Sequence, residues 1–502
     1  MKNWILILLL LISCTYAWEK TWDSMHRESF TDFVQLQDGG FILVGHKGTT
    51  LPVYTGIYTT RVDSDGNTLW TRFDYAGGAT DMAKGIVSID DTTFAIVGVM
   101  ESAFPDDYSY LYLSRISING NTLWTSVCDT AFFGDAVDIA ADGNIVVMDG
   151  SWPMLQKYNL SGAGVWASRF YSYPYNFIIK LWDMKSINRD SYYESGYITC
   201  GYGTRTTGSN YHAVIARFDS EGDTLWVRHY GNSEHEEFYS ITNIMNPAPG
   251  YPEGFLAVGY SDSCSSKMCS GSWFIVRTDL HGDTVWTKCL SHPDYGFGEQ
   301  YVNDIVWVGN ETYQTKFAIA GVTTFPESLG SKTATWLVVI SDTLRGDTLW
   351  TKTYDRFTDQ IPNSIVLCDD GGFAIAGYAE DSVLLPYPHK MDMWLLRVDS
   401  LGNDLPYAIS ETAPVKPQAI TLSAYPNPFN SAVNISVNGS VGEGLAPSCV
   451  EIFDIAGRRV AKLPRLASRG TPSQAKGNSP LFKEGWPKVG VFLSGNPHPP
   501  SV

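Results

Sequence analysis

Five stretches of the chain combine aspartate, asparagine and glycine in an arrangement that could bind calcium. They read DSDGNTLW at 63–70, INGNTLW at 118–124, DSEGDTLW at 219–226, DLHGDTVW at 279–286 and LRGDTLW at 344–350, and a weaker copy, SGAGVW, ends at Trp166. Asp63, Asp65 and Asn67 have the spacing of oxygen ligands in a calcium loop, but the twelfth position, which needs a bidentate Glu, is the shorter Asp74. The other copies lose ligands while glycine stays, and glycine at positive φ is what a short hairpin turn requires. The sequence favours a repeated turn, with calcium at the first copy as the alternative.

Carboxylates near the start of strands that lead inward could form an acid/base pair for glycoside cleavage. The candidates are Asp32, Asp81, Asp135, Glu237 and Asp304. Acids of this kind more often lie solvated in loops, so this chemistry is the second interpretation. The histidines add no support, because His235-Glu236-Glu237 lacks the second histidine of a zinc-protease helix and the sequence contains no GxSxG nucleophile motif.

The composition is that of an acidic protein rich in strands and turns. The chain has 502 residues, with 53 acidic against 35 basic side chains and a net charge of −18. This charge repels phosphate backbones, so nucleic acid is not expected as a partner. Hydrophobic residues make up 44% and glycine occurs 46 times, which together favour a packed core of strands over long helices.

The N-terminus, MKNWILILLLLISCTYAWEK, has the pattern of a secretory signal peptide over residues 1–17. Its apolar run is too short to remain as a membrane span, and no later segment is apolar for long enough to be one. Thr15-Tyr16-Ala17 predicts cleavage before Trp18, and acylation of Cys14 as a lipoprotein is the alternative.

The cysteines indicate at most a local disulfide. Cys264 and Cys269 flank a short loop and could pair in an exported protein. Cys200 and Cys368 lie in strand-like runs and are expected to be buried thiols. The spacing of the cysteines and histidines does not fit a zinc site.

Two further elements recur between the turns. One is an apolar strand ending in glycine, such as GGFILVG at 39–45, and the other is a strand that usually carries a basic residue, such as TTRVDSDG at 59–66. With the Trp strand, each unit supplies about four short strands in roughly 40–60 residues, the size of one propeller blade. We therefore predict an all-β fold, a seven-bladed β-propeller of four-stranded antiparallel blades over residues 18–405, with an irregular β-solenoid as the alternative.

The count of strands predicts how the ring closes. Seven Gly-ended strands and seven strands of the basic type are present, and Trp strands number seven only when WEKTWD at 18–23 is included. The slot after 399–403 reads DLPYA, where Pro406 cannot donate to a sheet ladder. The N-terminal strand is therefore expected to complete the last blade, which removes an open edge.

The variable connections predict where function lies. Those after the Gly-ended strand and after the Trp strand emerge on the same rim, and insertions on one face mark the binding face of a repeat protein. The repeated tryptophans are expected to pack between blades, with sugar binding by exposed tryptophans as the alternative. Better candidates for ligand contact are aromatic residues of the variable connections, namely Tyr54, Phe104, Tyr108, Tyr211 and Tyr295.

The repeat pattern stops near residue 406, and residues 406–420 have the composition of a linker. YPNPFN at 425–430 and DIAGR at 454–458 resemble the C-terminal sorting domain of the bacterial type IX secretion system. The residues that carry this resemblance are Tyr425, Pro426, Asn427, Pro428, Phe429, Asn430, Asp454, Gly457 and Arg458. The repeats likewise resemble secreted bacterial propeller-like proteins that carry this domain.

The resemblance implies a truncated immunoglobulin-like β-sandwich over 421–463, handling by the type IX secretion machinery, and a secreted or cell-surface location. Residues 464–502 depart from the family pattern and are expected to form an irregular basic tail.

The sequence as a whole predicts an exported, non-enzymatic propeller that binds an extracellular protein or glycan through its loop-rich face. The alternative is a secreted carboxylate-dependent hydrolase or lyase that acts on polysaccharide in the propeller funnel. Apart from calcium at the first turn, no cofactor or metal is expected.

Overall fold

The structure is a computed structural model of the chain. It describes residues 17–22, 27–48, 55–75, 81–101, 109–128, 133–170, 177–187, 195–205, 210–231, 235–245, 252–262, 271–294, 300–311, 314–327, 330–342, 345–380 and 391–404, and beyond these the strands of the C-terminal region. The chain forms two compact units, Thr15–Pro406 and Met1–Cys14 with Tyr407–Val502. All secondary structure in the described residues is β-strand.

The larger unit contains, in its described residues, five four-stranded antiparallel sheets whose strands are neighbours in chain order. The first two consist of β2 (Glu28–Gln35), β3 (Phe41–Gly48), β4 (Thr55–Val62) and β5 (Thr68–Asp74), and of β6 (Met82–Asp90), β7 (Thr93–Glu101), β8 (Ser109–Ser117) and β9 (Thr122–Cys128). The next three consist of β10 (Ala136–Ile139), β11 (Ile145–Asp149), β12 (Met154–Tyr158) and β13 (Gly164–Arg169), of β14 (Phe177–Ile187), β15 (Gly196–Arg205), β16 (Tyr211–Asp219) and β17 (Thr224–Tyr230), and of β18 (Glu236–Met245), β19 (Pro252–Ser261), β20 (Ser272–Thr278) and β21 (Thr284–Leu290).

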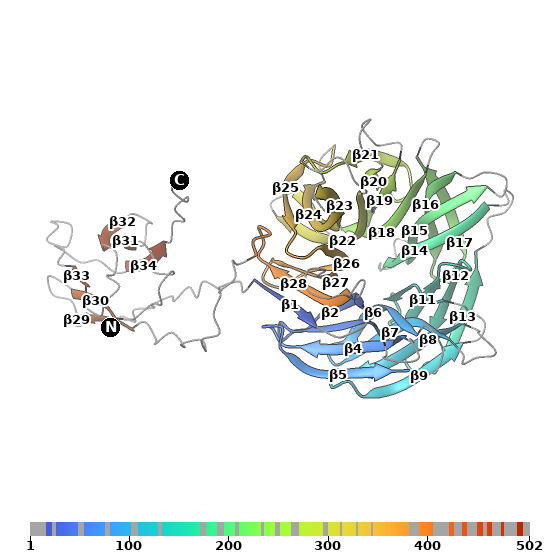
Figure 1. Cartoon of the computed structure of the whole chain (residues 1–502), viewed down its shortest axis with the longest axis horizontal. Helices are drawn as coiled ribbons and strands as arrows, with labels where there is room; N and C mark the ends of the chain where they lie inside the picture. Colours follow the sequence, from blue (N-terminus) through green and yellow to red (C-terminus); the bar gives the residue numbers. More distant parts are fainter. Residues whose placement is uncertain are drawn as a thin grey trace, which may run out of the picture. The chain divides into compact units, whose positions relative to one another are not determined.

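An eight-stranded sheet holds the other strands of this unit. They are β22 (Gln300–Glu311), β23 (Gln314–Glu327), β24 (Gly330–Ser341), β25 (Thr348–Tyr354), β26 (Asp359–Leu367), β27 (Phe373–Glu380), β28 (Met391–Val398) and β1 (Trp18–Trp22). A single parallel pair, Thr333 with Asp359, joins β22–β25 to the set β26, β27, β28 and β1. The pairing therefore contains seven four-stranded sets, which follow one another around a common centre (Figure 1). The all-β, propeller-like prediction is confirmed, and seven blades is our interpretation of this pairing.

The N-terminal strand closes the ring as the count of strands predicted. β1 pairs antiparallel with β28, from Trp18 opposite Arg397 to Trp22 opposite Met393. Glu19 adds side-chain bonds, since it accepts from Trp394 Nε1 at 2.7 Å and from Gln360 Nε2 at 3.0 Å. The last set is thus built from both ends of the propeller sequence.

The repeated turn packs its glycine on the tryptophan of the preceding set. A Cβ atom at Gly120 would lie 3.1 Å from the Trp70 ring, and φ at this glycine is +80°. The same contact recurs between Gly66 and Trp18, Gly162 and Trp124, Gly222 and Trp166, Gly282 and Trp226, Gly346 and Trp286, and Gly402 and Trp350. The indole N–H of Trp124 also donates to the carbonyl of Leu160 in the next set at 2.9 Å. The tryptophans therefore pack between sets, as predicted.

Four of the repeated turns open with an aspartate that stabilises the turn from within. Asp63 Oδ1 accepts from the N–H groups of Asp65 at 3.0 Å and Asn67 at 2.8 Å, and its Oδ2 accepts from Asn67 Nδ2 at 3.0 Å. The corresponding Asp219, Asp279 and Asp399 make the same pair of backbone bonds. These are the bonds that the turn interpretation predicts, and calcium at the first copy stays a prediction.

The hydrophobic core lies between sets and is continuous around the ring. One cluster joins Ile42, Val44 and Ile57 of the first set to Phe94 and Ile96 of the second, and the other clusters likewise draw on neighbouring sets. Both faces of the middle strands are buried because each set packs against two neighbours. This arrangement explains why these strands are apolar at nearly every position.

The C-terminal unit contains two three-stranded sheets in its described residues. They are β29 (Thr421–Tyr425), β30 (Asn434–Asn438) and β33 (Ser473–Ala475), and β32 (Arg459–Leu463), β31 (Cys449–Asp454) and β34 (Val489–Ser494). β34 pairs with β31, from Cys449 opposite Ser494 to Asp454 opposite Val489. The expectation of an irregular tail from residue 464 is therefore corrected at β33 and β34. The short alternation in VGVFLS was the missed signal, and the immunoglobulin-like arrangement stays a prediction.

The cysteines behave partly as expected. Cys200 and Cys368 are free and buried. Cys289, for which no partner was predicted, is disulfide-bonded. Cys264 and Cys269, the predicted pair, and Cys14 lie outside the described residues.

Candidate functional site

The innermost strands bring a set of polar residues to one level of the ring. Three carboxylates, Asp32, Asp183 and Asp304, occupy the same register, opposite Val44, Cys200 and Ala320. Ser240 and Ser364 occupy it in β18 and β26, opposite Val258 and Ala376. A bulge precedes each of these five residues, so the residue before it is displaced from the ladder.

Two serine hydroxyls link the three carboxylates. Ser240 Oγ lies 2.8 Å from Asp183 Oδ2 and 2.8 Å from Asp304 Oδ1. Ser364 Oγ lies 2.9 Å from Asp32 Oδ1 and 3.1 Å from Asp304 Oδ2. The order Asp183, Ser240, Asp304, Ser364, Asp32 crosses five successive sets, and we call these residues the carboxylate–serine chain. Because a hydroxyl carries one proton, the second contact of each serine is a hydrogen bond only when a carboxyl group is protonated.

Backbone N–H groups occupy most of the remaining acceptor sites. Asp304 accepts from Ile305 N at 2.8 Å and, across sets, from Ile365 N at 2.9 Å. Asp183 accepts from Met184 N at 2.7 Å and Ile241 N at 3.0 Å. Asp32 also binds across sets, since Ile86 N donates to it at 2.9 Å. Each carboxylate therefore joins its own strand to the next innermost strand.

Lys185 is the cation of this region. Its Nζ lies 3.1 Å from Asp183 Oδ1. Desolvation alone would lower the pKa of Lys185, but the neighbouring Asp183, Asp304 and Asp138 outweigh it and raise the pKa. Lys185 therefore stays charged and offsets part of the negative charge of the carboxylate–serine chain.

Burial keeps protons on the acids at higher pH than usual. It raises the pKa of Asp32 to about 6, and Asp304 adds to this effect while the N–H of Ile86 opposes it. Burial also raises the pKa of Asp304, with Lys185 opposing and Asp183 adding to the shift. The same cause raises the pKa of Asp138, which accepts from Ser186 N at 2.6 Å. The region can thus hold protons near neutral pH.

The sequence analysis named five acids as candidates for an acid/base pair, and the structure brings two of them together. Asp32 and Asp304 meet at Ser364, whereas Asp81 binds the N–H of Glu101 at 2.9 Å and Asp135 that of Gly150 at 2.9 Å. Glu237 accepts from the hydroxyl of Tyr239. Asp183, Lys185, Ser240 and Ser364 were missed by the sequence analysis, because their common register appears only once the strands are aligned.

Aromatic rings gather near the rim from which the long connections leave, which we call the loop-bearing rim. Tyr202 and Tyr211 make an edge contact with ring centroids 4.9 Å apart, and Tyr211 lies 5.0 Å from His235. Trp182 is 6.3 Å from Tyr202 and 6.2 Å from Tyr239. We call these five residues the mouth group. Trp182 and Tyr239 immediately precede Asp183 and Ser240, so the mouth group borders the carboxylate–serine chain.

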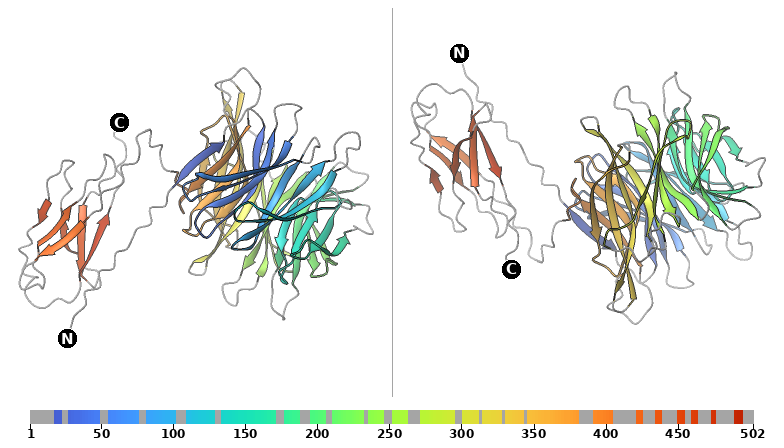
Figure 2. Two further views of the ribbon diagram at one scale, coloured as in Figure 1. Left: turned by 90° about the horizontal axis from the view of Figure 1, so that it is seen from below. Right: turned by 90° about the horizontal axis from the view of Figure 1, so that it is seen from above.

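Tyr211 is the one predicted ligand contact that the structure describes, and its side chain is 39% exposed. Tyr54, Phe104, Tyr108 and Tyr295 lie outside the described residues. The loop-bearing rim also carries the β23–β24 hairpin, which stays paired to Glu327 opposite Gly330 and projects beyond the neighbouring strands (Figure 2). Trp182, Tyr202 and Tyr239 were missed because they lie within strands, and His235, just before β18, was considered only as part of a zinc-protease motif.

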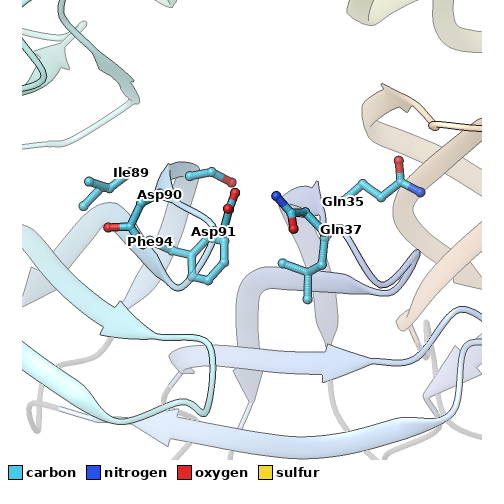
Figure 3. A pocket seen from close by; sticks show the side chains of 8 residues that line it. Gln35, Gln37, Ile89, Asp90, Asp91 and Phe94 are labelled. Carbon is cyan, nitrogen blue, oxygen red and sulfur yellow. The ribbon is translucent and has the colours of Figure 1, made fainter.

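A separate cavity of about 170 Å³ opens at the opposite, tight-turn rim. It lies between the turn after β2 and the turn after β6, where Gln37 and Asp91 face each other (Figure 3). Asp90 belongs to its lining but is held by Thr92 and Thr93, which lower its pKa to about 2. The cavity is small and is lined by residues of these two turns and of the strand ends that flank them. It does not resemble the loop-rich site that the sequence predicted.

The C-terminal region matches a known family. Residues 423–473 match the model of the secretion system C-terminal sorting domain. The match includes the motif Tyr425–Asn430 and the turn Asp454–Arg458, most of which lies outside the described residues, and it extends past residue 463, the predicted end of the domain. The sorting domain identifies a secreted or cell-surface protein that is handled by the type IX secretion machinery. The described residues contain no helix that is long and apolar enough to span a membrane.

Among curated proteins, none matches the chain. Similar solved structures include virginiamycin B lyase from Staphylococcus aureus, with 10% identity over 76% of this chain and 99% of that one and a TM-score of 0.42. An α-L-arabinofuranosidase from Fusarium graminearum has 9% identity over 76% and 97% and a TM-score of 0.41. The Plexin A4 extracellular region has 11% identity over 89% and 57% and a TM-score of 0.43. A lyase, an arabinofuranosidase and an extracellular region do not distinguish catalysis from binding as the function of this chain.

Proposed function

We propose that the protein is an exported binding module that holds an extracellular partner on its loop-bearing rim without transforming it. The observation that carries this proposal is the mouth group, an array of five rings on that rim with Tyr211 exposed. Exposed aromatic residues on a rigid scaffold supply large contact areas at low entropic cost, as binding surfaces require.

The bonding of the acids argues against catalysis by them. Each oxygen of Asp304 accepts from a backbone N–H, of Ile305 or Ile365, and also has a serine hydroxyl, of Ser240 or Ser364, within hydrogen-bond distance, so little room is left for a substrate. Asp183 is similarly surrounded, because Met184 N, Ile241 N and Lys185 donate to it and Ser240 lies within hydrogen-bond distance. A general acid or base must reach the reacting proton, and these carboxylates are instead committed to neighbouring strands.

Asp32 favours a second candidate function, hydrolysis or lyase chemistry on a polysaccharide. In the described residues its Oδ2 accepts only from Ile86 N, and its pKa of about 6 suits a general acid. This group is the residue to remove when binding and catalysis are compared.

The test uses the purified full chain on intact bacteria and on an array of neutral, acidic and amino-sugar oligosaccharides. Bound oligosaccharides are then assayed for new reducing ends and for unsaturated products. Binding that Tyr211→Ala weakens, without product formation, is the expected result. Product formation that Asp32→Asn abolishes would overturn the binding module in favour of the hydrolase or lyase. Failure to bind either cells or oligosaccharides would also overturn it.

A further inference from the structure

The residues displaced by the bulges differ around the ring in what they contact. In β2 and β26 they bond across sets: Thr31 Oγ1 donates to the carbonyl of Ala83 at 3.0 Å, and Asn363 Nδ2 lies 2.8 Å from Ser29 Oγ. In β14, β18 and β22, the innermost strands of three successive sets, the displaced residues are Trp182, Tyr239 and Asn303. Two of these three are rings of the mouth group, so this side of the ring is built differently from the other.

Polar atoms without partners lie on the same side. Trp182 Nε1, Asn303 Oδ1 and His235 Nδ1 are enclosed and make no hydrogen bond within the part of the chain that the structure describes. Trp182 Nε1 needs an acceptor and Asn303 Oδ1 needs a donor. A hydroxyl group can supply either, and groups left in this state are commonly completed by a bound molecule or water. Both atoms are covered, so an incoming group must displace a neighbouring side chain to reach them.

The charges near the mouth group restrict the ligand. Asp183 directly follows Trp182, and Ser240, which follows Tyr239, lies 2.8 Å from both Asp183 and Asp304. Glu237 accepts from Tyr239 within the group. Lys180 lies over the Trp182 ring at 4.1 Å and already occupies that cation–π position. An anionic ligand would face these carboxylates, and a cationic one would compete with Lys180. A neutral ligand with an apolar face and several hydroxyls meets neither obstacle.

We infer that the mouth group binds a neutral oligosaccharide, which stacks on Tyr211 and Tyr202 and places hydroxyls against Trp182 Nε1 and Asn303 Oδ1. This inference rests on the proposed function and adds the ligand class and the residues. Tyr202 joins Tyr211 to Trp182, with ring separations of 4.9 and 6.3 Å, so the three rings are neighbours on this rim.

The experiment measures the affinity of the full chain for the neutral oligosaccharides of the array by calorimetry. Tyr211→Ala is expected to weaken binding about tenfold, as loss of a central aromatic contact does. Trp182→Phe keeps a ring but removes the N–H, and Asn303→Ala removes the acceptor, so each is expected to weaken binding about three- to tenfold. Trp307→Phe is the matched control, because Trp307 Nε1 also lacks a partner but lies farther along β22, outside the mouth group. Thermal unfolding of each variant identifies any that do not fold, and Asn303→Ala supports the test if Trp182→Phe is one of these.

The outcomes separate the inference from the proposed function. Binding to bacteria that periodate abolishes and protease leaves intact supports the sugar ligand, since periodate cleaves the vicinal diols of sugars. Binding that protease abolishes, a preference for acidic oligosaccharides, or unchanged affinity in both Trp182→Phe and Asn303→Ala would overturn the inference while the binding module stands. Absence of all binding would overturn both.

Discussion

Asp32 gives the sharpest prediction, because it joins the carboxylate–serine chain to the second set and because its pKa is strongly raised. Burial moves its pKa from 3.8 to about 6, which corresponds to about 3 kcal/mol between the protonated and ionised forms. Since the folded-state pKa is above the ordinary value, the stabilisation is fully present below pH 3.8 and is lost as the pH rises through 6. The geometry agrees, because a proton on Asp32 can bond to Ser364 Oγ and let the serine proton point to Asp304.

Asp32→Asn removes this titration and keeps the size of the side chain. Its amide has a single acceptor oxygen and cannot replace both Oδ1, which accepts from Phe33 N, and Oδ2, which accepts from Ile86 N, so the variant is expected to be less stable than the native chain at pH 4 by about 1–3 kcal/mol. Between pH 4 and pH 8 the native chain then loses about 2 kcal/mol relative to the variant, because part of the roughly 3 kcal/mol is already lost below pH 4. The two unfolding free energies should therefore converge, and can cross, as the pH rises.

Urea unfolding of the full chain, followed by tryptophan fluorescence at pH 4 to 8, measures this difference. Ser64→Ala, in the exposed first turn, is the control: it changes no titratable group and should differ from the native chain by the same amount at every pH. The titratable neighbours Asp304, Asp183, Asp138 and Lys185 remain in both proteins, so their direct contributions largely cancel in the comparison. A difference for Asp32→Asn that changes by less than about 1 kcal/mol across this range, near the extrapolation error, would refute the reasoning.

Three further predictions concern the architecture. Gly162 and Gly143 lie in the same sheet with similar positive φ, but only at Gly162 would a new Cβ meet a ring, at 2.9 Å from Trp124. Thermal unfolding should therefore show that Gly162→Ala lowers the unfolding free energy by about 1–2 kcal/mol more than Gly143→Ala does, and equal losses would contradict the packing argument. Glu19→Ala should reduce the unfolding free energy by about 1–3 kcal/mol, because the indole N–H of Trp394 loses its acceptor. The control Glu221→Ala, in an exposed turn, should have little effect, and equal effects of the two substitutions would count against ring closure through Glu19. Burial raises the pKa of Cys200 and raises that of Cys368 to about 12, so both thiols should resist alkylation by iodoacetamide at pH 8 until urea unfolds the protein, and rapid labelling of either thiol in the native state would show that it is accessible.

The repeated features could be predicted from the sequence because each repeat marks the same geometric need. The turn glycine, the tryptophan and the Gly-ended strand recur because every set must turn at φ > 0 and pack on its neighbour, as Gly120 on Trp70 shows. The missing tryptophan strand before Pro406 likewise indicated that β1 completes the last set. Such rules depend on local spacing, which a single sequence displays.

The candidate site could not be predicted in the same way, because it consists of what differs between repeats. Asp32, Ser240 and Asp304 are unlike residues at one register, and their relation depends on bulges that shift the strand by one residue. Trp182 and Tyr239 lie inside strands, where aromatic residues are ordinary, so only the ring contacts set them apart. Tyr211 was predicted because it lies where a variable connection ends.

The two ends of the carboxylate–serine chain indicate how stability and binding are divided in this fold. At one end, the next innermost strand carries Gly85 at this register, opposite Val97, and Asp32 there bonds to the backbone of Ile86 instead of to a side chain. The carboxylate–serine chain is therefore not a closed ring but an arc, whose other end is Asp183. Trp182, Tyr239 and Asn303 immediately precede the three members of the arc at that end. A ligand on the mouth group would thus lie over the part of the arc where both oxygens of each carboxylate have two polar neighbours, and away from Asp32, whose Oδ2 accepts only from Ile86 N in the described residues.

This geometry predicts that Asp32→Asn changes the stability and its pH dependence but leaves the oligosaccharide affinity unchanged. Asn303→Ala should lower the oligosaccharide affinity and leave the stability and its pH dependence unchanged. Additive effects in the double variant would show that the two regions act independently.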